Sequence, residues 1–158
     1  MATPLLATLL LALSQAEAPS PSDAAGTLIV LNTSEATAAL VDPATGEVRR
    51  TLPTGAGPHE AAVSPDGRTA VVCDYGQQEP GGTLTVIDLA EAAVVRTVSL
   101  GEHRRPHGIE YQADGRHVVV TSETSRAILR VDVVAGEVTD VFPTEAAASH
   151  MLALSADG

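Results

Sequence analysis

The chain has 158 residues, of which 44% are hydrophobic, enough to fold one domain of ordinary size around a core. Twenty acidic residues stand against nine arginines and no lysine, for a formal net charge of −11. This balance argues against nucleic acid as a partner, because binding to phosphates relies on basic side chains. Aromatic residues make up only 2% of the chain, so the core must consist of Val, Leu, Ile and Ala.

Residues 1–18 have the features of a secretory signal peptide. The apolar run from Leu5 to Leu13 is shorter than the roughly 20 residues needed to cross a bilayer. Ala16 and Ala18 supply the small residues of a cleavage site. Residues 19–26, rich in Pro, Ser and Ala, follow as a linker. We therefore expect a protein that is secreted or periplasmic after cleavage of its signal.

Short β-rich runs separated by turn residues fill the chain beyond residue 27, and nothing after the signal has helical periodicity. The sequence therefore predicts an all-β fold. Asp-Gly pairs predict hairpins with type I′ turns, and a longer loop is expected at 75–82. Cys73 lies in an apolar run and is expected to be an inert core thiol. The predicted strands are 27–31, 38–42, 47–52, 59–64, 69–74, 84–88, 94–100, 107–112, 117–121, 127–132 and 137–142.

One stretch occurs three times, and it organises the chain. In each copy a histidine is followed seven residues later by Asp-Gly, and the copies start at His59, His107 and His150. A second element recurs between them, a strand that ends in Asp and is followed four residues later by Gly46, Ala92 or Gly136. Because Ala92 replaces a turn glycine, the middle copy is expected to use another turn type or to carry slight strain there.

Units of four short antiparallel strands, named A to D, that recur every 40 to 50 residues or so are typical of β-propeller blades. Stacked blades cover each other, which explains strands that carry apolar residues on both faces. The repeat pattern predicts strands B to D of one blade at 27–53, complete blades at 58–101 and 106–144, and strand A of a further blade at 149–158.

These motifs resemble the YVTN-type β-propeller repeat of bacterial and archaeal exported proteins. The shared pattern is Pro-His, a short apolar strand, an Asp-Gly turn, a second apolar strand, a loop and a strand that ends in Val-Ile-Asp. The turn at 64–67, Ser-Pro-Asp-Gly, matches in full, and the turns at 112–115 and 155–158 match at Asp-Gly. The Val-Thr-Asn portion is reduced to Val-Leu-Asn at 30–32 and to Val-Cys-Asp and Val-Thr-Ser in the later copies.

Three blades do not close a ring, because propellers contain about four to eight. We therefore expect residues 27–158 to be a partial arc, the N-terminal part of a longer protein. The resemblance implies a parent of about seven blades. The alternative is a ring in which two or more chains supply blades to each other.

The predicted D-to-A and B-to-C loops share one rim of the propeller, where His59, His107 and His150 would surround the channel mouth. Imidazoles in this position are candidate ligands for copper, zinc or iron. The alternative is a purely structural role, in which each histidine bonds its own loop. The same rim carries an arginine pair that could orient a carboxylate or phosphate, and an insertion suited to specificity. These further candidates are Arg104, Arg105 and Glu79.

The sequence indicates a non-enzymatic scaffold that binds a small molecule or a protein at its channel rim. Two alternatives stay open: binding of a metal or redox centre by the rim histidines, and lactonase-like hydrolysis, which rests only on resemblance to other propellers. Glu60 and Glu110 do not occupy matched repeat positions, so they predict no acid–base pair. No motif for a catalytic nucleophile, a P-loop or a dinucleotide occurs, and we expect no catalytic residue and no cofactor beyond a transition metal.

Overall fold

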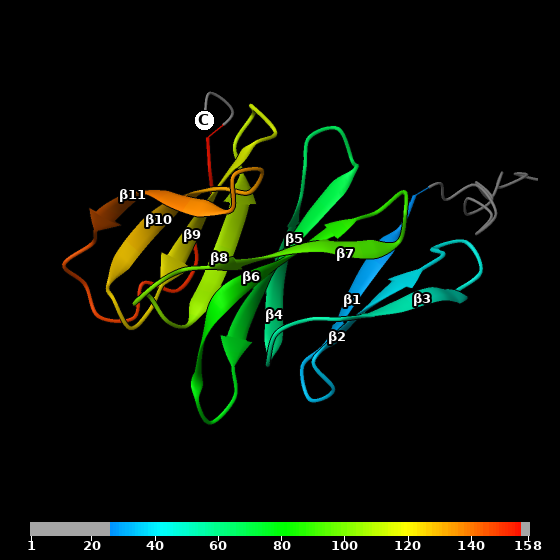
Figure 1. Ribbon diagram of the computed structural model, residues 1–158, viewed down its shortest axis with the longest axis horizontal. Helices are drawn as coiled ribbons and strands as arrows, with labels where there is room; N and C mark the ends of the chain where they lie inside the picture. Colours follow the sequence, from blue (N-terminus) through cyan, green and yellow to red (C-terminus); the bar gives the residue numbers. More distant parts are fainter. Residues whose placement is uncertain (1–25, 156–158) are drawn as a thin grey trace, which may run out of the picture.

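A computed structural model describes residues 26–155, in which all regular structure is β-strand (Figure 1). The predicted all-β fold is thereby confirmed. No segment among these residues forms a helix of the length and apolar character that a membrane span requires. The strands are β1 (Leu28–Asn32), β2 (Thr37–Val41), β3 (Val48–Pro53), β4 (Pro58–Val63), β5 (Thr69–Gly76), β6 (Pro80–Asp88), β7 (Ala93–Ser99), β8 (Pro106–Tyr111), β9 (His117–Ser122), β10 (Ala127–Asp132) and β11 (Glu137–Pro143).

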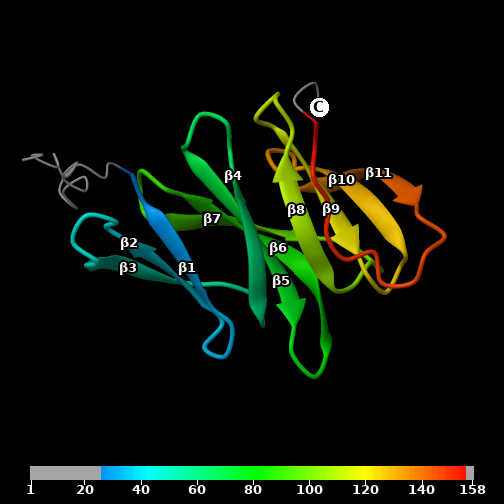
Figure 2. The same cartoon turned by 180° about the vertical axis from the view of Figure 1, so that it is seen from behind.

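The strands form three antiparallel sheets that stand next to one another as propeller blades (Figures 1 and 2). In hydrogen-bonded order they are β1-β2-β3, β4-β5-β6-β7 and β8-β9-β10-β11. The second and third sheets follow the simple A-to-D order of a blade. Their first strands, β4 and β8, contact each other, so the two innermost strands of these blades meet where the blades converge.

Two apolar cores fill the spaces between the sheets, one on either side of the middle blade. Strand β5 contributes to both, because alternate side chains of a strand point to opposite faces. Val71 and Cys73 pack toward the third sheet, and Ala70 and Val72 pack toward the first. All four side chains are fully buried. This explains the apolar residues on both faces, and it places the Cys73 thiol inside the core.

The two Asp-Gly turns within the described residues, at 66–67 and 114–115, are not type I′, which corrects the sequence expectation. Gly67 has a φ of 72°, but Asp66 is not among the residues with positive φ, whereas a type I′ turn needs positive φ at both. The backbone N–H of Gly67 donates to the carbonyl of Ser64 at 2.8 Å, across Pro65 and Asp66. Proline suits the first central position of a type I turn, and this turn is followed by a left-handed glycine.

The corners between strands C and D are built alike in every blade. The carboxylate of Asp88 accepts the backbone N–H groups of Ala90 and Glu91, both at 2.9 Å, and the aspartates at the ends of β2 and β10 do the same. Ala92 has a φ of 50°, in the left-handed region that Gly46 and Gly136 occupy in the other blades. The middle corner therefore keeps the same conformation and carries strain, since alanine is disfavoured there.

Two segments differ from expectation. The loop predicted at 75–82 is mostly strand, because β5 extends to Gly76 and β6 begins at Pro80. This close pairing requires glycine: a Cβ on Gly81 would lie 1.9 Å from the carbonyl oxygen of Asp74. Residues 149–155, the described part of the predicted last strand A, form no strand. Residues 1–25, with the signal and most of the linker, and 156–158, with the last Asp-Gly, lie outside the described residues.

Candidate functional site

Strands β4 and β8 each contain a β-bulge at the same position of the repeat. In β4 the pairs are Pro58 with Asp74 and then Ala61 with Val72, so His59 and the next residue together oppose Cys73. In β8 the pairs are Pro106 with Ser122 and then Ile109 with Val120, which leaves His107 and Gly108 opposite Thr121. A bulge re-aims the side chain of its extra residue. Both blades therefore place a histidine in a bulge at the start of the inner strand.

The three histidines of the repeat lie in a row, which we call the histidine row: His59, His107 and His150. The ring centroids of His59 and His107 are 4.3 Å apart, and those of His107 and His150 are 3.8 Å apart. The central ring, His107, is only 3% exposed, whereas the side chains of the outer two are 44% and 59% exposed. The structure thus brings together the residues that the repeat pattern selects as rim ligands.

A carboxylate and a phenol complete the cluster. Glu123 Oε1 lies 2.6 Å from Nδ1 of His150, and the hydroxyl of Tyr75 donates to Glu123 Oε2 at 2.8 Å. The ring of Tyr75 meets that of His107 edge-on, with centroids 5.4 Å apart. An ionised carboxylate only accepts hydrogen bonds, so Nδ1 of His150 donates. In the neutral ring the lone pair is then on Nε2, which is free to bind a ligand.

The electrostatics of the cluster set its protonation. Burial, followed by the charges of His150 and His59, lowers the pKa of His107 and favours a neutral ring. Burial alone would raise the pKa of Glu123, but hydrogen bonds from His150 and Tyr75 outweigh it and leave that pKa lowered, so the carboxylate is ionised. The hydrogen bond to Glu123 raises the pKa of the Tyr75 hydroxyl, which stays a donor.

One buried nitrogen of the cluster has no hydrogen-bond partner within the described chain, Nδ1 of His107. His107 is also shared by two groups of side chains whose nitrogen and oxygen atoms lie within 4.8 Å of one another. One group is His59, Glu60 and His107, and the other is His107, Glu123 and His150. Imidazole with carboxylate is a donor set that suits zinc, copper, nickel and iron. Either group could thus hold a transition-metal ion.

Sequence reasoning missed Tyr75 and Glu123, although both have a positional signal. Each stands 16 residues after the histidine of its own repeat, Tyr75 near the end of β5 and Glu123 directly after β9. The equivalent positions therefore meet at the same rim, as the repeat requires. Because one is a phenol and the other a carboxylate, no recurring residue type marks the position.

The three other predicted rim residues, Arg104, Arg105 and Glu79, do not all lie at the histidine row. The guanidinium carbon of Arg105 lies 4.7 Å from the ring centroid of Tyr75, and Arg105 donates to the carbonyl of Gln77, so it borders the cluster. Arg104 instead donates to carbonyls of its own loop, those of Gly101 and His103. Glu79 is exposed in the short connection between β5 and β6. The arginine pair thus does not act as a unit.

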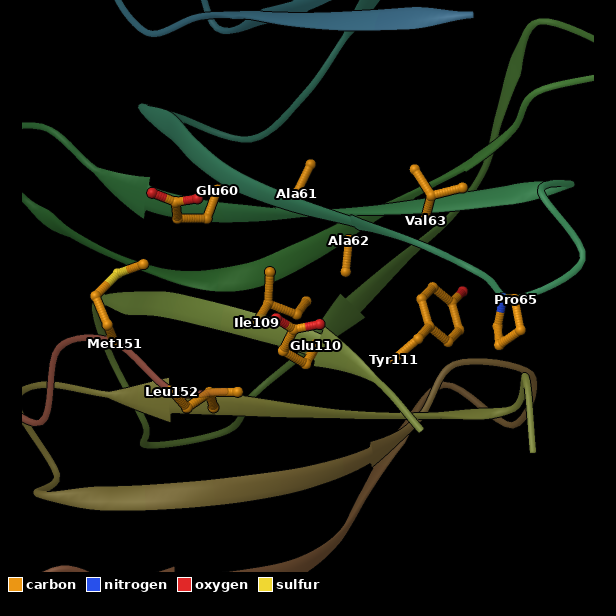
Figure 3. A pocket seen from close by; sticks show the side chains of 10 residues that line it. All are labelled: Glu60, Ala61, Ala62, Val63, Pro65, Ile109, Glu110, Tyr111, Met151 and Leu152. Carbon is orange, nitrogen blue, oxygen red and sulfur yellow. The ribbon is translucent and has the colours of Figure 1, made fainter. Parts of the chain in front are cut away.

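A hollow of about 370 Å³ lies between β4 and β8, beside the histidine row (Figure 3). Its walls combine apolar side chains with two carboxylates, those of Glu60 and Glu110. Tyr111 lies in its wall with a buried hydroxyl that lacks a partner within residues 26–155, and burial raises the pKa of this hydroxyl to about 12. The remaining lining residues are Ala61, Ala62, Val63, Pro65, Ile109, Met151 and Leu152.

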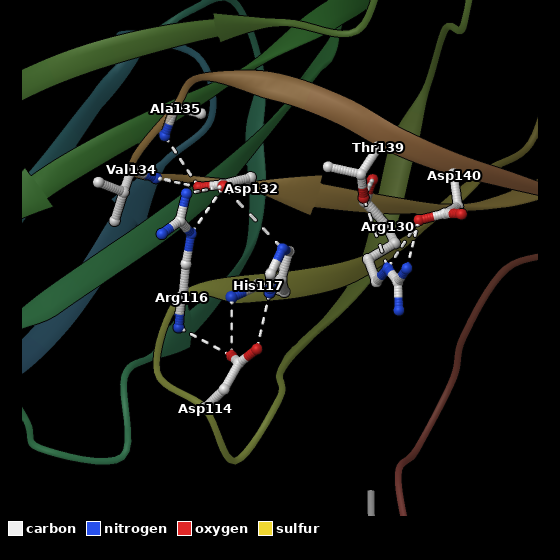
Figure 4. A network of polar contacts seen from close by, with 9 residues as sticks. All are labelled: Asp114, Arg116, His117, Arg130, Asp132, Val134, Ala135, Thr139 and Asp140. Atoms are coloured by element: carbon white, nitrogen blue, oxygen red, sulfur yellow. Dashed lines mark hydrogen bonds and ion pairs between the residues drawn. The ribbon is translucent and has the colours of Figure 1, made fainter.

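The opposite rim carries a polar network whose members are mutually satisfied (Figure 4). Asp114 accepts the backbone N–H groups of Arg116 and His117, and Nδ1 of His117 lies 2.7 Å from its other oxygen. Arg116 donates to Asp132 at 2.7 Å and so ties the hairpin between β8 and β9 to the corner after β10. This network is structural, because its carboxylates are occupied by turn N–H groups and by an arginine.

Comparison with known proteins supports the propeller architecture. A family model described as YNCE-like beta-propeller matches residues 1–102. No curated protein matches the chain. Among solved structures the chain is similar to Kuenenia stuttgartiensis Hydrazine Synthase, with 26% sequence identity and a TM-score of 0.75. This similarity covers 88% of the present chain but only 38% of that chain, so the present chain spans well under half its length.

Proposed function

Because the chain belongs to the YNCE-like β-propeller family, we propose that it is a non-enzymatic propeller scaffold that binds a ligand through the histidine row at its inner rim. The ligand is a small molecule, an ion or a group on a partner protein. The similarity to hydrazine synthase supports the scaffold, and the proposal takes no catalytic step from that enzyme.

The observation that carries this proposal is the unpartnered Nδ1 atom of His107 in the middle of the row. A buried polar atom without a partner costs about 1–3 kcal/mol, so the stability of the fold does not account for it. A ligand that bonds this imidazole, or repositions the exposed rings beside it, would supply the missing interaction. Because His59 and His150 are both exposed, such a ligand can reach the row from solvent.

A thermal-unfolding screen tests the proposal. The purified chain is heated with divalent metal ions, small carboxylic acids, amines and nucleosides, one at a time, in parallel with the triple variant H59A/H107A/H150A. We expect at least one compound to raise the unfolding temperature of the native chain and to leave that of the triple variant unchanged. A screen in which no shift depends on the histidine row would refute the proposal.

We also propose that the protein is exported, because residues 1–18 combine a short apolar run with small residues at a cleavage site. Expression with these residues present, followed by cell fractionation and N-terminal sequencing, tests this step. The expected product is periplasmic or secreted and begins at Pro19. A cytoplasmic product that retains Met1 would contradict export without affecting the binding proposal.

A further inference from the structure

We propose that His107, His150 and Glu123 form a binding site for a divalent transition-metal ion such as Zn²⁺. This inference rests on the proposed function, because it assigns the class of ligand that the histidine row takes. The three side chains come from different parts of the fold: the bulge of β8, the segment after β11 and the loop after β9. Their donor atoms lie within 4.8 Å of one another.

The geometry is close to what a metal ion needs. Zinc binds imidazole nitrogen at about 2.0–2.1 Å, so the ligand atoms of a tetrahedral site lie roughly 3.3 Å apart. Nδ1 of His150 and Oε1 of Glu123 are 2.6 Å apart, so an ion that takes both residues as ligands must replace the hydrogen bond between them, and the His150 ring must rotate. His150 has that freedom, because its side chain is 59% exposed. His107 stays fixed, because it is buried between two other rings, 4.3 Å and 3.8 Å from their centroids.

The backbone of His150 is anchored even though its ring is free. Its carbonyl oxygen accepts the backbone N–H of Gly108 at 3.0 Å and the hydroxyl of Thr121 at 2.8 Å. Gly108 is needed here, because a Cβ would lie 2.9 Å from that carbonyl oxygen. The segment is therefore held against the bulge that carries His107, which keeps the two imidazoles adjacent.

The alternative group, His59, Glu60 and His107, is less well prepared. Nδ1 of His59 and Oε1 of Glu60 are 3.8 Å apart, and both side chains are more than a third exposed. Glu123 is only 14% exposed and is oriented by the Tyr75 hydroxyl at 2.8 Å. Outer hydrogen bonds of this kind orient metal ligands and raise metal affinity. We therefore assign the ion to the group that contains Glu123.

Titration of the metal-free full chain with Co²⁺, followed by visible absorption, tests the assignment. Low-coordinate cobalt bound to nitrogen gives intense bands that hydrated cobalt lacks, and Zn²⁺ should abolish them by displacement. Calorimetric titration with Zn²⁺ then gives the affinity. We expect one ion per chain, a loss of affinity of about 100-fold or more in H107A and in H150A, and a loss of about 10-fold to 100-fold in E123Q.

The matched control is H103A. Nδ1 of His103 is also buried and unpartnered within the described residues, but His103 belongs to neither group of candidate ligands. H103A should bind Zn²⁺ as the native chain does, and H59A should lose far less affinity than H150A. Circular dichroism establishes that each variant is folded, and because His150 is exposed, H150A keeps the test valid if H107A does not fold.

Unchanged Zn²⁺ affinity in both H107A and H150A would overturn the assignment. Loss of binding in H59A with retention in H150A would also overturn it, by placing the ion in the other group. If no metal binds, but an organic compound in the thermal screen acts through the histidine row, this inference fails and the proposed function stands. If neither binds, both fail.

Discussion

The side chains of His107 and Asp74 are both buried, but they differ in their hydrogen bonds. Asp74 is 1% exposed, and burial raises its pKa, yet its oxygens accept the N–H of Gly55 at 3.0 Å and the hydroxyls of Thr83 at 2.7 Å and Thr85 at 3.1 Å. His107 is 3% exposed, and its Nδ1 has no partner in residues 26–155. Asp74 thus stabilises the fold, whereas His107 is available to a ligand.

This contrast predicts that substitution lowers the stability of the fold much more at Asp74 than at His107. Replacing Asp74 with Ala leaves buried donors unpaired and should lower the free energy of unfolding by about 3 kcal/mol. Replacing His107 with Leu removes an unsatisfied nitrogen and should change it by less than about 1 kcal/mol. Urea denaturation of the two variants measures both values. A loss of more than about 2 kcal/mol in His107→Leu would mean that the histidine is structural.

Among the strands, the bulge of β8 packs closely against the segment after β11. Residues 150–152 lie against Gly108, whereas Glu60 holds the equivalent position in β4. A Cβ at position 108 would lie 2.9 Å from backbone atoms of all three residues of that segment. Position 108 therefore requires glycine for steric reasons, which explains why this copy of the repeat differs from the copy in β4, where Glu60 stands.

Gly108→Ala should displace this segment. We expect faster hydrogen exchange of the amide of residue 108, because this N–H would lose the carbonyl of His150, and a stability loss of about 1–3 kcal/mol from overpacking. Glu60→Ala, at the equivalent position of β4, serves as control and should leave this exchange unchanged. Identical exchange in Gly108→Ala and the native chain would argue against the packing described.

The hairpin between β8 and β9 predicts a pH dependence. The N–H of His117, followed by its side chain and the N–H of Arg116, lowers the pKa of Asp114 from 3.8 to about 2. The unfolded chain therefore takes up this proton first as pH falls, so the stabilisation is present above about pH 4 and is lost between there and about pH 2. It amounts to roughly 1 kcal/mol, reduced by solvent screening because the carboxyl is half exposed.

Asp114→Asn should remove this part of the acid sensitivity. The urea concentrations that unfold half of the variant and half of the native chain should differ at neutral pH. The two values should converge as the pH falls toward about 2. Glu110→Gln removes the same charge from an exposed site on the preceding strand and controls for net charge. A constant difference between Asp114→Asn and the native chain at all pH values would contradict the assignment of the low pKa to Asp114.

The strands and their grouping into blades could be predicted because each depends on local pattern, apolar runs between turn residues at a fixed period. The family match and the three sheets confirm the resemblance to YVTN-type propellers. The type I′ expectation was wrong because it assumed two-residue loops, whereas hydrogen bonds from Ser64 to Thr69 and from Gln112 to His117 close loops of four residues, which are most often built around a type I turn. The roles of Tyr75 and Glu123 depend on contacts between blades, and neither residue type recurs in the repeat.

The described part of the molecule is an arc with two uncovered end faces. On β1, Ile29 and Leu31 pack into the core, while Leu28 and Val30 point the other way and are 51% and 39% exposed. At the other end Phe142 of β11 is 49% exposed. Exposed apolar strand faces favour association. We propose that further blades, in the same polypeptide or in another chain, cover these faces.

The 158-residue chain alone should therefore self-associate through its end faces. Sedimentation velocity over a range of concentrations should show association that decreases in the double variant V30T/F142T, because threonine keeps strand propensity with a smaller apolar surface. Val95→Thr changes a valine that is 59% exposed on β7 of the middle blade, and it should not alter association. A native chain that stays monomeric at all concentrations would contradict the prediction.

The bulges in β4 and β8 have a consequence for how such proteins diversify. Each bulge leaves its histidine outside the paired ladder, whose register is kept by the residues on either side. A substitution at the bulge therefore changes what the rim can bind without changing how the strand pairs. Selection can act on one blade at a time, so related propellers can gain, exchange or lose a rim ligand through single substitutions while the scaffold is inherited unchanged.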